Sequence, residues 1–230
     1  MRELLYMGYD YDNKDGFAKL PDNRHANYGD FLRWMGQYVF NGEYAVIFAD
    51  KRSPYRLIKV INLDLTDGDS NWGQADFFEE NWQKDIEGLV KVYAFTKFIA
   101  TKPMMLTLTN KIIEGASNII KITQILDMDE NDEMSMWLME KVDYVGLTHP
   151  DLSKTEMIDL VASAAHNIGT RTGYALTDLK PQNYGFRNDG SAVIFDFNLE
   201  VAEQNYWMGR DMKSFEDYKY MITSASNTKV

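Results

Sequence analysis

Apolar segments separated by short polar turns occupy residues 34–63, and this pattern predicts β-strands. Three segments are rich in β-branched and aromatic residues: 34–40, 44–48 and 56–61. Asn41-Gly42 separates the first two, and Asn-Gly between apolar segments is a strong hairpin signal. The pattern therefore predicts three consecutive antiparallel strands, preceded by a turn-rich N-terminal extension over residues 1–33.

Apolar residues then recur at helical spacing. They predict a long helix over 76–99 and a second helix over about 106–115, with Pro103 as the break between them. Two further strands are predicted at 118–126 and 134–140, on either side of an acidic, solvated turn.

The last third of the chain contains a clear helix start. Ser153 and Glu156 have the spacing of a capping box, and apolar residues at helical spacing follow them. This predicts a helix that ends at Gly169. The apolar run 192–195 predicts a buried strand, and residues 210–222 predict a last helix.

Composition limits the classes of function. The 230-residue chain is 45% hydrophobic and 13% aromatic, which is enough for a packed core. Its net charge of −11 argues against nucleic acid or a membrane surface as a partner, because both attract basic surfaces. The chain has no cysteine, and no segment approaches the roughly 18 apolar residues of a membrane span. These features predict a soluble, cytoplasmic protein without disulfides or thiolate metal sites.

The candidate chemistry lies in one segment of the second half. Asp178, Lys180 and Asn183 lie within six residues, and Asp196 follows Asn183 by thirteen positions, beyond the predicted strand. Asp and Asn oxygens suit Mg²⁺, and an Asp in a tight loop can position a hydroxyl nucleophile. A purely structural interpretation, in which these residues only shape turns, stays open.

The run from Asp178 to Asn183, Asp-Leu-Lys-Pro-Gln-Asn, and the later pair Asp196-Phe197 resemble two motifs of the eukaryotic-type protein kinases. The family pattern is H-R-D-L-K-x-x-N in the catalytic loop and D-F-G at the metal-binding strand. Leu176 and Thr177 stand where the family has His and Arg, and Asn198 replaces the Gly. The missing Arg removes the usual partner of a phosphorylated activation loop.

The resemblance implies an α+β, bilobal protein-kinase-like fold. It would have an antiparallel-sheet small lobe over 34–140, with a helical insertion at about 62–105. A reduced, truncated helical large lobe would occupy 141–230.

The resemblance also implies catalytic roles, with ATP and Mg²⁺ as cofactors. Asp178 would orient an acceptor hydroxyl and accept its proton. Lys180 would neutralise the transferred phosphoryl group, and Asn183 and Asp196 would hold Mg²⁺.

Further residues would bind the nucleotide. Lys59, on the third predicted strand, would anchor the ATP phosphates; the alternative is an ordinary exposed strand lysine. Met139, Glu140 and Val142 occupy the place of the kinase hinge, where Met139 would border adenine and the other two would offer backbone groups to it.

Other features favour an inactive relative of the kinases. The segment that corresponds to the glycine-rich loop of the kinases contains few glycines. If the fourth strand begins near residue 118, the Glu that should pair with Lys59 is expected near Thr107, and no Glu is found there. Only 32 residues follow Asn198 in the 230-residue chain, too few for a complete kinase large lobe.

Two hypotheses therefore stay open. The first is a Mg·ATP-dependent phosphotransferase that acts on a hydroxyl. The second is a catalytically inactive kinase-like (pseudokinase) module with a protein partner, such as a viral structural or host-modulating protein in a virion or a host cytoplasm.

Overall fold

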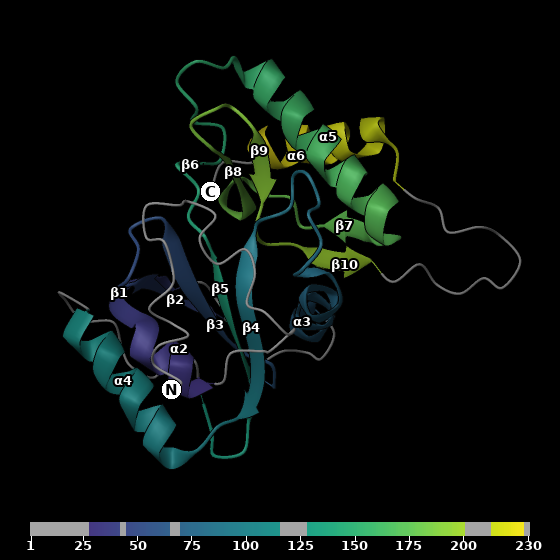
Figure 1. Ribbon diagram of the computed structural model, residues 1–230. Coiled ribbons are helices and arrows are strands. Elements are labelled where there is room, and N and C mark those ends of the chain that lie inside the picture. Colours follow the sequence, from purple (N-terminus) through teal and green to yellow (C-terminus); the bar gives the residue numbers. More distant parts are fainter. Residues whose placement is uncertain (1–27, 42–44, 65–69, 116–127, 201–212, 228–230) are drawn as a thin grey trace, which may run out of the picture. The chain divides into compact units, whose positions relative to one another are not determined.

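The computed structural model of the chain describes residues 28–41, 45–64, 70–115, 128–200 and 213–227 (Figure 1). The helices there are α2 (Tyr28–Trp34), α3 (Ser70–Asn81), α4 (Lys102–Gly115), α5 (Lys154–Thr172), the 3-10 helix η2 (Pro181–Asn183) and α6 (Phe215–Asn227). The strands are β1 (Met35–Asn41), β2 (Ala45–Asp50), β3 (Arg56–Asn62), β4 (Val92–Ile99), β5 (Glu133–Glu140), β6 (Tyr144–Val145), β7 (Ala175–Thr177), β8 (Tyr184–Phe186), β9 (Ala192–Ile194) and β10 (Asn198–Glu200). The predicted α+β class is confirmed.

The chain folds as two compact units that are interleaved along the sequence. The first unit comprises Met1–Gly68 and Val92–Lys141, and the second comprises Asp69–Lys91 and Val142–Val230. Helix α3 therefore belongs to the second unit, although the strands before and after it belong to the first.

The first unit is built on a five-stranded antiparallel sheet of order β1-β2-β3-β5-β4. The central strands β3 and β5 are almost entirely buried, and β3 buries the polar residues Arg56, Lys59 and Asn62 along with its apolar ones. In the register of the sheet, Lys59 on β3 lies between Ile47 on β2 and Trp137 on β5.

One face of this sheet forms the core of the first unit together with α2 and α4 (Figure 1). Ile58, Val60, Met136 and Leu138 point into this core. Because successive side chains of a strand point to opposite faces, Lys59 lies on the other face, where Trp137 is its neighbour across the strands.

The described part of the second unit has two small sheets, the α-helices α3, α5 and α6, and the 3-10 helix η2. Strands β6, β8 and β9 form one antiparallel sheet, and β7 pairs with β10 in the other. Helix α5 packs on β9 and α6, and α3 packs on β10. The segment after α3 joins β9: the Val90 N–H donates to the Ile194 carbonyl (3.0 Å), and the Ile194 N–H donates to the Gly88 carbonyl (2.8 Å).

The capping box predicted at the start of α5 is confirmed. The Glu156 N–H donates to Ser153 Oγ (3.3 Å), and the Ser153 N–H donates to the Glu156 carboxylate (2.8 Å). The predicted end of the helix is wrong. Gly169 is a buried helical residue, and the helix ends at Thr172, where Gly173 adopts the left-handed conformation (φ 78°) that favours glycine.

The predicted helix over 76–99 is also wrong. Residues 70–81 form α3, whereas 92–99 form β4, whose sequence is rich in Val, Tyr, Phe, Thr and Ile. Gly88 lies in the segment between them. Its φ of +85° is not a helical value, so the helix does not continue through this residue. The expected Glu position near Thr107 depended on a fourth strand that begins near residue 118. Among the described strands the fourth is β4, and the helix that precedes it is α3.

Several other boundaries differ from the predictions. Residues 28–34 form α2 within the predicted extension, and Pro103 lies in the first turn of α4, where its missing N–H costs no hydrogen bond. The last helix spans 215–227. The predicted strand at 118–126 lies outside the described residues, as does most of the extension. None of the described helices has the length and apolar content needed to cross a membrane.

Candidate functional site

The motif residues at 178–183 form a tight loop directly after β7. Asp178 adopts a left-handed backbone conformation (φ 58°), which Asp tolerates better than most residues because its short side chain can form local hydrogen bonds. The Lys180 N–H donates to the Asp178 carbonyl (2.8 Å), and the Asn183 N–H donates to the Lys180 carbonyl (2.9 Å). The loop thus turns sharply at Asp178 and continues into η2.

The side chain of Asn183 holds this loop together. Asn183 is buried, and its Nδ2 donates to the Asp178 carbonyl (2.7 Å) and to Asp178 Oδ2 (3.1 Å). On the other carboxylate oxygen, Lys180 Nζ lies 2.6 Å from Asp178 Oδ1. The Asp178 carboxylate is therefore oriented through both of its oxygens, while remaining partly open to solvent.

Asp196 is brought to the same loop by the main chain. The Asn183 carbonyl accepts hydrogen bonds from the N–H groups of Phe195 and Asp196, each at 3.1 Å. The pairing of β7 with β10, in which Thr177 lies opposite Asn198, also draws the two motif segments together. The structure thus brings Asp178, Lys180, Asn183 and Asp196 together within the second unit.

Gln74 on α3 is a site residue that the sequence reasoning missed. Its Nε2 donates to Asp196 Oδ1 (2.9 Å) and to the Phe197 carbonyl (2.8 Å), and the residue is only 2% exposed. Its position three residues before Phe77, on a helix whose buried face carries Phe77 and Phe78, was the available signal. The helix predicted at 76–99 did not include it.

Lys59, Met139 and Glu140 belong to the first unit, whereas Val142 is the first residue of the second unit's later segment. Lys59 is only 4% exposed, and its Nζ lies 5.0 Å from the centroid of the Trp137 ring, close enough for a cation–π interaction. The alternative of an ordinary exposed strand lysine is therefore wrong. Met139 and Glu140 end β5 and are also buried.

The donor atoms of the second unit suit Mg²⁺. Asp178 and Asp196 supply carboxylate oxygens, and because Asn183 Nδ2 donates to Asp178, the amide oxygen is the atom of that side chain suited to a cation. The described residues contain no cluster of three or more His, Cys, Asp or Glu side chains that could hold a metal by themselves. Mg²⁺ is commonly bound by one or two carboxylates together with substrate phosphates, so this donor set fits such a shared site.

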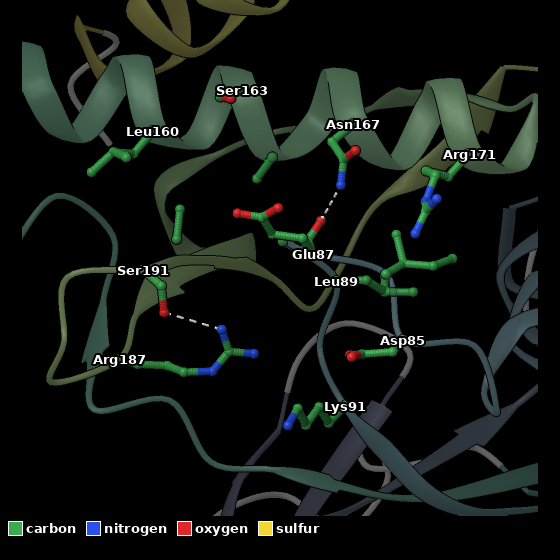
Figure 2. Close-up of a pocket in the computed structure, with 14 residues that line it drawn as sticks. Asp85, Glu87, Leu89, Lys91, Leu160, Ser163, Asn167, Arg171, Arg187 and Ser191 are labelled. Atoms are coloured by element: carbon green, nitrogen blue, oxygen red, sulfur yellow. Dashed lines mark hydrogen bonds between the residues drawn. The ribbon is translucent and has the colours of Figure 1, made fainter.

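The second unit also has a pocket of about 760 Å³, lined by α5, the segment 85–91 and the β8–β9 hairpin (Figure 2). Asn167 Nδ2 donates to the Glu87 carbonyl (2.8 Å) across it, and Arg187 Nη1 donates to Ser191 Oγ (3.1 Å). Acidic and basic side chains both line the pocket, and none of the predicted site residues does.

Comparison with known proteins finds no family model that matches the chain and no curated protein that matches its sequence. The motif and the contacts described above are therefore the basis for a proposal of function.

Proposed function

We propose that the protein is a kinase-like phosphotransferase that uses Mg·ATP and transfers a phosphoryl group to a hydroxyl acceptor. The observation that supports this most is the contact set around Asn183. One buried amide holds the loop of Asp178, and the carbonyl of the same residue holds the backbone of Asp196. Such a connection ties the backbone of Asp196 to the loop that holds the oriented Asp178 carboxylate, and phosphoryl transfer depends on groups that are positioned in advance.

Each motif residue of the second unit would have a separate role in phosphoryl transfer. Asp178, oriented by Asn183 and Lys180, would position the acceptor hydroxyl and receive its proton. Lys180, which is half exposed, would turn from Asp178 to the transferred group. Mg²⁺, when bound, would neutralise charge on the phosphates, and Asn183 and Asp196 would hold it.

The first unit supports the proposal independently. In the protein kinases, a lysine on the third strand binds the ATP phosphates. Lys59 occupies the third strand of an antiparallel sheet and is buried there. The proposal includes the bilobal kinase-like fold, with the first unit as the small lobe, Lys59 as the phosphate anchor and Met139, Glu140 and Val142 as the adenine-binding segment.

The test is the thermal unfolding of the protein with ATP, with Mg²⁺ and with both. Mg·ATP should raise the melting temperature more than either alone, since a ligand at 100 times its Kd stabilises the folded state by about 2.7 kcal/mol. Lys59→Met should abolish the shift. Lys102→Met, which removes an exposed lysine of the same unit, is the matched control and should keep it.

Chemistry is tested separately from binding. Asp178→Asn should keep the Mg·ATP shift and lose phosphoryl transfer. A wild-type melting temperature that does not respond to millimolar Mg·ATP would refute the proposal.

One observation favours the second candidate function, a catalytically inactive kinase-like module with a protein partner. The kinases carry His and Arg directly before the catalytic Asp, whereas Leu176 and Thr177 stand at those positions in this chain. A folded protein that binds no Mg·ATP, yet forms a stoichiometric complex that Asp196→Asn leaves intact, would establish this alternative.

A further inference from the structure

We infer that Gln74 is a positioning residue that sets the orientation of the Asp196 carboxylate for metal binding, an inference that rests on the proposed function. The Gln74 amide carries two hydrogens, and each has its own acceptor: Asp196 Oδ1 at 2.9 Å and the Phe197 carbonyl at 2.8 Å. One amide therefore fixes the Asp196 side chain relative to the main chain of the next residue.

Contacts on two sides complete this restraint. The Asp196 N–H is bonded to the Asn183 carbonyl, which fixes the backbone of the metal-binding position. Phe197, which is 2% exposed, packs its ring 5.1 Å from that of Phe77 and 5.8 Å from that of Phe78, both on α3. Helix α3 thus contacts the Asp196-Phe197 pair through two aromatic side chains and through the polar side chain of Gln74, which reaches the carboxylate.

The amide has a chemical advantage over other side chains at this place. A carboxylate oxygen has two lone pairs, so Oδ1 can accept the hydrogen bond from Gln74 and still bind a cation. A Lys or Arg at position 74 would neutralise the carboxylate and compete with the metal, and a Glu would repel it. Gln orients the carboxylate without changing its charge.

Residues that orient metal ligands in this way typically contribute 10- to 100-fold to metal affinity. The loss of the Gln74 amide should therefore weaken Mg²⁺ binding by at least about 10-fold. ATP binding in the absence of Mg²⁺ should be unchanged, because the hydrogen bonds of Gln74 described above go to the metal-binding residue and to its neighbour in the chain.

The experiment compares Gln74→Met with Asn81→Leu. Met has nearly the shape of Gln but cannot donate. Asn81 is the matched control: it is a buried amide on the same helix, 1% exposed, and its Nδ2 donates within α3 to the Phe77 carbonyl. Mg²⁺ is titrated at a fixed ATP concentration, and the Mg²⁺ concentration that gives half of the thermal shift is measured for each protein. Gln74→Met should raise it at least about 10-fold, and Asn81→Leu should leave it near the wild-type value.

Gln74→Asn provides a second variant in case Gln74→Met does not fold. It keeps a buried amide but is shorter by one methylene, so it cannot reach both acceptors and should also weaken Mg²⁺ binding. A wild-type Mg²⁺ midpoint in the folded Gln74 variants overturns this inference alone, and equal weakening in Asn81→Leu overturns it as well. A wild-type protein without any Mg²⁺-dependent shift overturns the proposed function, and this inference with it.

Discussion

The close approach of Gly88 to α5 gives a sharp test of how the second unit is packed. Gly88 has φ +85°, a conformation that costs an L-residue about 1–2 kcal/mol. A Cβ at this position would lie 2.4 Å from Ala164 Cβ and 2.8 Å from Ala164 Cα. Fitting an extra methyl group into such a tightly packed site typically costs a further amount of about 1–3 kcal/mol. Gly88→Ala should therefore destabilise the second unit by about 2–5 kcal/mol.

Gly190 offers a matched control in the same unit. Its φ of +83° is almost the same, but a Cβ there would meet only Leu152 Cδ1, at an ordinary 3.7 Å. Gly190→Ala should therefore cost only the backbone term of about 1–2 kcal/mol. The difference between the two variants isolates the cost of the contact with α5.

The measurement is guanidinium unfolding followed by far-UV circular dichroism, together with hydrogen exchange of the amides of α5. Exchange is needed because two units need not unfold in one transition. In Gly88→Ala, the α5 amides and the amide of Ile194, which donates to the Gly88 carbonyl, should lose the most protection. If Gly88→Ala is no more destabilising than Gly190→Ala, the contact argument is refuted.

Three further predictions concern single hydrogen bonds. Tyr218→Phe removes the buried hydroxyl that accepts the Leu176 N–H (3.1 Å) and should cost about 1–3 kcal/mol in chemical denaturation. Ser135→Ala removes the acceptor of the buried Trp137 indole N–H (2.6 Å); it should cost a similar amount, of about 1–3 kcal/mol, and change the tryptophan fluorescence. Hydrogen bonds at the α5 N-cap hold the pKa of Glu156 below its ordinary value of 4.5, so its contribution to stability is complete above that value and is lost as the pH falls through the lowered pKa. Melting temperatures of Glu156→Gln should therefore fall less steeply on acidification than those of the wild type, and parallel curves would contradict this.

Local signals in the sequence predicted the strands, turns and helix starts that are determined by neighbouring residues. The Asn41-Gly42 turn and the β-branched residues around it predicted β1, β2 and β3, and the capping box predicted the start of α5. The loop around Asn183 could be predicted for the same reason, because its hydrogen bonds to Asp178 join residues that are only five positions apart.

Contacts between distant segments could not be predicted in this way. Gln74 lies 122 positions before Asp196, and its place on the buried face of α3 does not indicate which distant residue it contacts. The hydrogen bond from the Leu176 N–H to the Tyr218 hydroxyl likewise joins residues 42 positions apart. Strand β4 was mistaken for a helix because residues 92–95 are a continuous apolar run, and periodicity alone does not distinguish a buried strand from a buried helix there. Its β-branched and aromatic composition and the preceding Gly88 favour the strand.

The order in which the chain visits its two units limits how the protein can be dissected. It crosses from one unit to the other at residues 68/69, 91/92 and 141/142, so no single cut releases either unit whole. A fragment beginning at Val142 would lack α3 and the segment that pairs with Ile194, and would leave the main-chain groups of β9 and the ring of Phe197 uncovered. Assays of a truncated protein would therefore reflect misfolding and not the activity of one unit. Point substitutions in the full chain are the informative way to separate the contributions of the two units.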